Sequence, residues 1–397
     1  GPLTARAYLT HINSMPVYLI DGEMIAPDGM VYSQDPILDG RKYIFFSLAA
    51  VEMIRHLGWK PDVVHANDWH TGAALYALAL KKKVDPEFRH VHGLISVHNL
   101  PFLGKDAAPA VKEFGLPPAR SKSLPKWAEY FPLPMGLVAA EDIVAVSPGY
   151  AMEILTPEFG CGLQDFLLTR KDRLHGILNG LDQEAWDPET DAAITSHYSV
   201  NTLNLKLANK VALQDELNLS SQSDVPLLVM ITRMDQQKGV DIAVEGLRRA
   251  ADHPWQAVIL GTGDPLLETS CRSLEAEFPD RVRALIKYDA ALSHRLYAAG
   301  DILLMPSRYE PCGLAQMIAM RYGCIPLARA TGGLRDTIRD DPTYATSTGF
   351  LFQEAQPEAF FETLLRALYL YPDQEIWRQM QIRGMQQDYS WQKSAIE

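Results

Sequence analysis

Short runs of apolar residues alternate with longer amphipathic segments along most of the chain. In the first half, the pattern predicts strands at 16–20, 62–65, 94–98 and 142–146, and helices at 41–57 and 71–82. The second half repeats the alternation, with strands at 227–232, 257–260, 282–286, 302–306 and 324–328, and helices at 240–252, 314–321 and 359–370. This order is typical of α/β proteins built on parallel sheets.

The length of 397 residues exceeds what one hydrophobic core usually supports, so two domains are expected. Turn residues cluster between the two runs of alternation, as in Asn179-Gly180 and Asp187-Pro188. We place one domain at 1–174 and the next at 175–390, with 391–397 as the start of a helix that is cut short. Two doubly wound domains would bind ligands at the carboxyl ends of their strands.

Composition and charge narrow the functional classes. The net charge of 37 − 49 = −12 disfavours nucleic acid as the main partner, and Lys81-Lys82-Lys83 is expected to be the solvated end of a helix. No apolar run is long enough to span a bilayer. The four cysteines are widely spaced without a Cys-x-x-Cys pair, which favours a reducing compartment over a disulfide framework or zinc site. No feature of the sequence favours a particular oligomeric state.

Two strand-to-helix loops in the second half carry charged side chains. Arg233 and Lys238 lie between a strand and the start of a helix, where free N–H groups and the helix dipole favour anions such as a diphosphate. Glu310 follows another strand and precedes Gly313 and Leu314. A carboxylate there could bind sugar hydroxyls. The alternative for each is an ordinary charged residue at a helix cap.

Glycines mark a third loop, in which Gly332-Gly333 precedes a helix and could allow close approach to phosphate oxygens. The turn at Gly261-Thr-Gly263 has no third glycine at the spacing of a dinucleotide fingerprint, which argues against a nicotinamide dehydrogenase.

Polar residues also follow two strands of the first half, with Asp68 in one loop and His98-Asn99 in the other. Histidine and asparagine can hydrogen-bond sugar hydroxyls, and Trp69 or Phe102 could stack on a sugar face. The histidines match no metal-binding spacing, so we expect no metal site.

Taken together, the motifs form an ordered series. They are DVVHANDWHTG, SVHNLPFLG, ILNGLDQEAWDP, TRMDQQKGVD, LGTGDP, SRYEPCGLAQMIAMRYGCIP and TGGLRDT. The series resembles the bacterial glycogen synthase and plant starch synthase family over residues 17–391, nearly the whole chain. The resemblance implies a GT-B fold of two Rossmann-like domains and transfer of glucose, with retention, from ADP-glucose or UDP-glucose to the non-reducing end of an α-1,4-glucan. It implies no cofactor or metal, no nucleic-acid or membrane partner, and a cytoplasmic location, or a plastid in a plant or alga.

The resemblance also implies roles for individual residues. Arg233 and Lys238 would bind the donor diphosphate and assist its departure, Glu310 would contact the donor glucose, and His98 would face the anomeric carbon. Further donor contacts are implied for Asn179, Tyr288 against the nucleobase, Gly313, Leu314, Gly332 and Gly333. Asp68, His98 and Asn99 would lie near the acceptor or the sugar.

The sequence departs from the family pattern at its start, where the family has a Lys-x-Gly-Gly-Leu loop. No such motif occurs here, and the chain begins without methionine, so we expect the first domain to be incomplete at its start. Ala315 also stands where relatives often carry a hydroxyl residue. Two alternatives stay open: a glucan- or nucleotide-binding homologue without turnover, and a GT-B transferase that acts on a small acceptor.

Overall fold

The computed structural model describes residues 3–25 and 31–397, and the chain divides into two compact units. The first unit runs to Val146 and includes Ala151–Gly176, whereas the second contains Ser147–Tyr150 and Ile177–Glu397. The short segment 147–150, which the sequence-based boundary assigned to the first domain, is bonded to the second unit. Ser147 Oγ donates to the Pro311 carbonyl at 2.6 Å, and Gly149 N–H donates to Asp336 Oδ2 at 2.7 Å.

The first unit contains a four-stranded parallel sheet whose strands lie in chain order, β3-β4-β5-β6. The strands are β3 (Val63–Asn67), β4 (His92–Val97), β5 (Asp142–Ala145) and β6 (Leu174–Gly176). The helices along this part of the chain are α1 (Pro36–His56), α2 (Asp68–Val84), α3 (Ala108–Glu113), α4 (Pro132–Ala139), α5 (Pro148–Glu153) and α6 (Gln164–Leu168).

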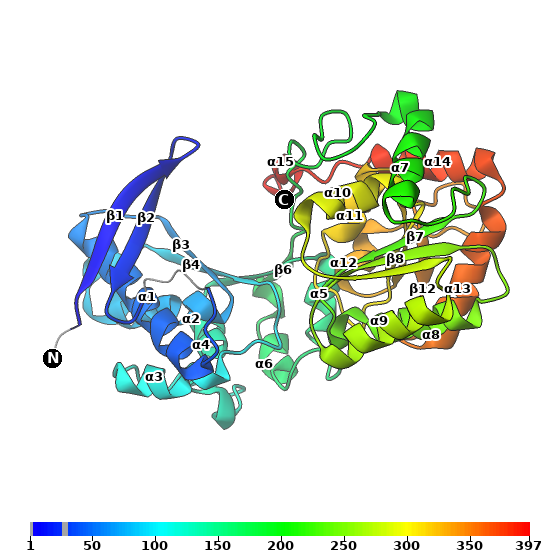
Figure 1. Cartoon of the computed structure of the whole chain (residues 1–397). Helices are drawn as coiled ribbons and strands as arrows, with labels where there is room; N and C mark the ends of the chain where they lie inside the picture. The colour runs from blue at the N-terminus through cyan, green and yellow to red at the C-terminus, as the bar shows by residue number, and fades with distance from the viewer. Residues whose placement is uncertain (1–2, 26–30) are drawn as a thin grey trace. The chain divides into compact units, whose positions relative to one another are not determined.

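The expected strand at 16–20 does form, but it does not join the parallel sheet. It lies in β2 (Met15–Gly22), which pairs antiparallel with β1 (Ala5–Ile12) in a separate hairpin (Figure 1). The two residues between the strands, Asn13 and Ser14, have φ of 49° and 68°. Positive φ at both central residues is typical of the tight hairpin turn that matches strand twist, so this local turn explains the pairing that the apolar pattern missed.

The second unit contains a six-stranded parallel sheet in the order β9-β8-β7-β10-β11-β12. The strands are β7 (Leu227–Ile231), β8 (Gln256–Gly261), β9 (Val282–Ile286), β10 (Ile302–Met305), β11 (Ile325–Arg329) and β12 (Phe350–Phe352). The order reverses between β7 and β10, whose Leu228 and Ile302 are paired. In open α/β sheets ligands bind outside the carboxyl ends of the strands at such a reversal.

Helices cover both faces of this sheet. They are α7 (Lys206–Glu216), α8 (Val240–Arg249), α9 (Pro265–Glu277), α10 (Ala290–Ala299), α11 (Ala315–Arg321), α12 (Gly332–Thr337), α13 (Pro357–Leu370), α14 (Gln374–Met385) and α15 (Trp391–Ser394). Leu228 and Met230 of β7 pack with α8, α9 and α13, whereas Leu227 and Val229 pack with α7, α10 and α11. Figure 1 shows α8 and α9 on one side of the strands and α10 and α11 on the other. Burial on both faces explains why this strand is continuously apolar.

Two details of the first unit differ from the sequence-based expectation. Helix α1 begins at Pro36 rather than near 41, because the Asp35 side chain caps it by accepting from Ile37 N–H at 2.9 Å. The lysine run at the end of α2 is not simply solvated. Lys81 pairs with Glu52 and Lys82 with Glu141, each at 2.6 Å.

Candidate functional site

The loops that follow β7 and β10 meet at the reversal of the second sheet, and each contributes one member of an ion pair. Lys238 Nζ donates to both oxygens of Glu310, at 2.9 Å and 2.7 Å. The two side chains retain only 18% and 7% of their exposure, so the pair is largely shielded from water. Ser307 Oγ donates to Glu310 Oε2 at 3.0 Å and fixes the carboxylate further.

A glycine allows the two loops to approach each other. Gly239 has φ of 66°, and a Cβ atom added there would lie 2.0 Å from the Pro306 carbonyl oxygen. Only glycine therefore fits between the short 3-10 turn Gln236–Lys238 and helix α8. Asp235 caps that turn, because its side chain accepts from Lys238 N–H at 3.0 Å. The backbone that carries the lysine is therefore held by this cap and by the close packing of Gly239.

Arg233 and Tyr288 lie in a neighbouring pocket of about 330 Å³. Arg233 is 66% exposed and pairs with Asp235 at 3.4 Å, and Tyr288 is 89% exposed. Both side chains are therefore available to a ligand at the carboxyl ends of β7, β8 and β9. The geometry brings two cationic side chains, Lys238 and Arg233, and an open aromatic ring to one edge of the sheet.

The glycine pair supports the Glu310 loop. A Cβ atom at Gly332 would lie 2.1 Å from the Glu310 carbonyl oxygen, and one at Gly333 would lie 2.0 Å from the Cys312 carbonyl oxygen. Gly333 N–H donates to the Glu310 carbonyl at 3.1 Å. This amide is thus engaged within the protein, whereas the sequence suggested that it faces a phosphate or the donor glucose.

Three further expected donor contacts lie on the same loop or against it. Gly313 has φ of 72°, and Leu314, 44% exposed, immediately precedes α11. The backbone of Asn179 hydrogen-bonds to the Cys312 thiol, whose pKa is raised to about 12, chiefly by burial. The structure therefore gathers Asn179, Gly313 and Leu314 around the segment that follows Glu310.

In the first unit, the ends of β3 and β4 bring together Asp68, His98 and Asn99. The Asp68 carboxylate accepts from the backbone N–H groups of His98 at 2.7 Å and Asn99 at 3.4 Å. Burial raises its pKa, although these hydrogen bonds oppose the shift. His98 Nε2 lies 2.9 Å from Asn67 Oδ1. Asp68 has φ of 53°, a strained conformation that is often found at functional sites.

Asn99 supplies an unusual feature of this group. Its side-chain oxygen is buried and has no hydrogen-bond partner among the described residues. Buried polar atoms are normally satisfied. An unsatisfied amide oxygen beside Asp68 and His98 suits a ligand that donates a hydrogen bond, as sugar hydroxyls do.

Comparison with known proteins identifies the family. Residues 3–169 match the family model described as the starch synthase catalytic domain, and residues 215–382 match glycosyl transferases group 1. The chain is 42% identical over 359 residues to a glycogen synthase of Anaeromyxobacter sp. (strain Fw109-5), covering 90% of this chain and 76% of the relative. It is 39% identical to the glycogen synthase of Syntrophotalea carbinolica, covering 99% and 82%.

The structural comparison agrees. The catalytic domain of starch synthase IV from Arabidopsis thaliana, solved with ADP and acarbose, superposes with a TM-score of 0.88 at 34% identity, covering 99% of this chain and 83% of that one. The chain belongs to the glycogen and starch synthase family. It is a hexosyltransferase of glycogen or starch synthesis with the GT-B fold, as the motif series predicted.

Within this glycogen and starch synthase fold, the structure adds residues that sequence reasoning missed. Trp186 and His294 stack with ring centroids 4.0 Å apart and line the pocket that contains Arg233 and Tyr288. Asp191 accepts from the Tyr322 hydroxyl at 2.6 Å and lies 2.8 Å from His294 Nδ1, which fixes the imidazole. These residues come from three separate segments, so their spacing along the chain does not reveal that they lie together.

An aromatic cluster adjoins Asp68 in the first unit. Tyr43 packs edge-on against Trp69 and His70, and the Tyr32 hydroxyl lies 2.8 Å from His70 Nε2. Burial is the main cause that lowers the pKa of His70 to about 4, so this imidazole is neutral near pH 7. Trp69, predicted from the sequence as a residue that could stack on a sugar, packs against Tyr43, a contact that its motif does not reveal.

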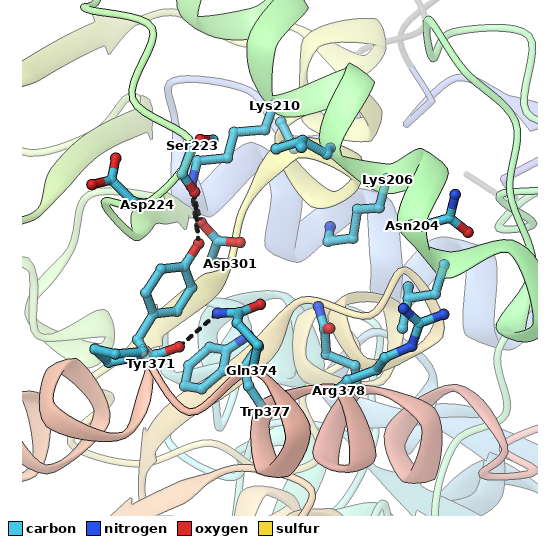
Figure 2. Close-up of a pocket in the computed structure, with 15 residues that line it drawn as sticks. Asn204, Lys206, Lys210, Ser223, Asp224, Asp301, Tyr371, Gln374, Trp377 and Arg378 are labelled. Carbon is cyan, nitrogen blue, oxygen red and sulfur yellow. Dashed lines mark hydrogen bonds and ion pairs between the residues drawn. The ribbon is translucent and has the colours of Figure 1, made fainter.

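The unit that contains Lys238 has a second pocket of about 590 Å³. It lies at the opposite edge of the six-stranded sheet, at the amino ends of the strands. Figure 2 shows Lys210, Asp301 and Tyr371 converging there. Lys210 Nζ donates to Asp301 Oδ2 at 2.7 Å and to the Tyr371 hydroxyl at 3.1 Å. Lys206 donates to the carbonyls of Tyr297 and Ala298 at the end of α10. These lysines therefore have structural partners, and we assign them no catalytic role.

Within residues 3–25 and 31–397, no group of three or more His, Cys, Asp or Glu side chains could hold a metal ion. No helix there is long and apolar enough to cross a membrane.

Proposed function

We propose that the chain transfers glucose from ADP-glucose or UDP-glucose to the non-reducing end of an α-1,4-glucan, with retention of configuration. One observation carries the proposal, namely the shielded Lys238–Glu310 pair at the strand reversal, whose lysine lies on the same loop as the exposed Arg233. A pure glucan-binding protein has no use for two cations directed at a diphosphate. The related starch synthase IV, whose structure holds ADP and acarbose, supports the same ligand classes.

In the proposed reaction, the bond between the anomeric carbon and the diphosphate oxygen breaks. A new bond to the acceptor 4-hydroxyl oxygen forms on the same face, and the hydroxyl proton passes to the departing diphosphate. Lys238 and Arg233 stabilise the charge that develops on that diphosphate. Glu310 binds the donor glucose and offsets positive charge at its reacting carbon. The protein thus acts mainly by positioning and by electrostatics.

The remaining assignments follow the same scheme. Tyr288 offers its ring to the nucleobase, and Asn179, Gly313, Leu314 and Gly332 surround the donor. Gly333 is assigned to support of the Glu310 loop, because its N–H is engaged there. In the first unit, Asp68 holds the backbone of His98 and Asn99, so that the His98 carbonyl can face the anomeric carbon and the Asn99 oxygen can accept from a sugar hydroxyl.

The test is incubation of the protein with radiolabelled ADP-glucose or UDP-glucose and glycogen, followed by isolation of the polymer. We expect label in α-1,4-linked polymer and a ladder of products from short maltooligosaccharides. Label in a single small product would identify a small-acceptor transferase instead. Binding of ADP without any transfer, even when a Lys-x-Gly-Gly-Leu unit from a relative is joined to the start of the chain, would refute turnover.

A further inference from the structure

Arg308 links the two loops that carry Lys238 and Glu310. Its backbone N–H donates to the Gln237 carbonyl at 2.7 Å, and its Nη1 donates to the Gln236 carbonyl at 2.9 Å. These two acceptors are the residues that immediately precede Lys238. Arg308, in the loop after β10, therefore fixes the backbone segment that carries Lys238.

The same guanidinium also holds the start of α8. Arg308 Nη1 and Nη2 donate to the two carboxylate oxygens of Asp241 at 2.9 Å and 2.7 Å. These hydrogen bonds are the main reason that the pKa of Asp241 is lowered. Because Asp241 lies in the first turn of α8, three residues after Lys238, the lysine is enclosed between two segments bound by one arginine.

Two further contacts complete the link. Gln237 Nε2 donates to the Tyr309 carbonyl at 3.2 Å, and Arg329 at the end of β11 donates to the Arg308 carbonyl. The loops after β7, β10 and β11 are thus joined through residues that flank Lys238 and Glu310. The Lys238 ammonium and the Glu310 carboxylate contact each other directly, so these links act on the backbone around the pair and not on the pair itself.

We propose that Arg308, acting through Asp241 and the carbonyls of Gln236 and Gln237, is a positioning residue that places the Lys238 ammonium for the departing diphosphate. The inference rests on the proposed function and deepens it. A planar guanidinium can bind a carboxylate at two points and a carbonyl at the same time, which an ammonium on a flexible chain does not reproduce. A positive charge at position 308 is therefore not sufficient to hold these segments together. The informative substitution is Arg308→Lys, which keeps the charge but loses the geometry of the guanidinium.

The experiment compares wild type, Arg308→Lys and Asp241→Asn for transfer from ADP-glucose to glycogen, and for ADP binding by calorimetry. A displaced lysine removes more stabilisation from the charged diphosphate, in the transition state and in free ADP, than from the bound donor in the ground state. We therefore expect kcat to fall about 10- to 100-fold. The KM for the donor should change by less than about 3-fold. Binding of ADP should weaken by about 10-fold, and the double variant should lose no more than either single one.

The Lys238→Met background separates positioning from a general structural role. There, Arg308→Lys should have no further effect on kcat or on ADP binding, because the residue through which it acts is gone. If Arg308→Lys lowers kcat or ADP affinity further in this background, the inference is overturned. An Arg308→Lys protein with unchanged kcat and ADP affinity would overturn it too.

The chain offers a closely matched control in Arg248, at the other end of α8. It binds Glu277 at two points, 2.9 Å and 2.7 Å, and the two pairs have nearly equal side-chain exposure, 33% and 42% against 34% and 42%. Arg248→Lys should leave kcat and ADP affinity unchanged, and an equal loss there would contradict the positioning role.

The proposed function and this inference can fail separately. If wild type transfers glucose and Arg308→Lys does so equally well, only the inference fails. If wild type transfers nothing but Arg308→Lys weakens ADP binding in a manner that depends on Lys238, only the proposed function fails. A wild type that does not bind ADP refutes both.

Discussion

Lys238 has three N–H donors, and the two oxygens of Glu310 lie on one side of Nζ, at 2.9 Å and 2.7 Å, so that they engage at most two of these donors. One donor direction therefore remains for a phosphate oxygen without the ion pair having to break. The pairing also keeps the ammonium oriented before a donor binds, which lowers the cost of reorganisation in the reaction.

Lys238→Met should lower kcat by about 100- to 1000-fold, or about 3–4 kcal/mol of barrier, the magnitude found when one donor to a developing anion is removed. The measurement is steady-state transfer of label to glycogen. Lys82→Met serves as control, because Lys82 is similarly shielded at 16% exposure and pairs with Glu141 at 2.6 Å. It should change stability but not kcat, and an equal loss of kcat in both variants would contradict the assigned role.

Single residues also show where sequence reasoning succeeds and where it stops. Lys238 and Glu310 could be selected because each follows a recognisable strand, and the structure brings them together. Ser307 and Arg308 stand in the same motif as Glu310, yet nothing in their type reveals their partners. Ser307 binds Glu310 three residues further on. The side-chain acceptors of Arg308, such as Asp241, lie more than 60 residues away and are set by the strand order.

At the scale of the elements, the junction between β7 and α8 depends on Gly239. Gly239→Ala should destabilise the fold by about 3 kcal/mol or more, because a positive φ and a clash with the Pro306 carbonyl act together. It should also reduce transfer, since the loops after β7 and β10 must move apart. Urea unfolding and the glycogen assay measure the two effects.

Gly58 separates the two causes. It follows α1 with φ of 61°, and a Cβ atom added there meets nothing within 4 Å. Gly58→Ala should therefore cost only the conformational term, about 1 kcal/mol. If the two variants lose equal stability, close packing against Pro306 is not what requires glycine at 239.

Helix α10 ends against the buried Lys206, and burial lowers the pKa of that ammonium to about 8 from an ordinary value of 10.5. Between these pH values the unfolded chain binds more protons than the folded one, so the stability contributed by this group rises with pH. From pH 7.5 to 9.5, the free energy of unfolding of wild type relative to Lys206→Met should rise by about 2 kcal/mol. Urea titrations at the two pH values measure it, and a difference that is flat or falls with pH would contradict the buried charge.

The elements themselves were only partly predictable. Alternation of apolar runs located five strands of the six-stranded sheet to within a residue or two, because strands buried on both faces are continuously apolar. It missed β12, which is only three residues long. The pattern could not show that 16–20 belongs to a hairpin, since the turn at Asn13-Ser14 decides its pairing. Nor could it show the strand order, which depends on crossovers between strands that are distant in the sequence.

At the scale of the whole molecule, the six-stranded sheet has its own core on both faces, and the four-stranded sheet belongs to a separate compact unit. The motif series predicted two domains of this kind. It did not predict that Ser147–Tyr150 would be bonded to the second unit, since the hydrogen bonds to Pro311 and Asp336 join residues more than 160 positions apart. The groups assigned to the nucleotide all lie in that second unit.

A nucleoside diphosphate should therefore stabilise the two units unequally. With ADP at about 100 times its dissociation constant, the second unit should gain about 2.7 kcal/mol against unfolding. Backbone amides of β7 and β10 that exchange only through unfolding of this unit should then exchange about 100-fold more slowly, whereas those of β4 and β5 should change little. Hydrogen exchange followed by mass spectrometry with and without ADP measures both. Equal protection of all four strands would show that the two units unfold together, and protection confined to β4 and β5 would place the nucleotide in the first unit and contradict the assignment of Lys238 and Arg233.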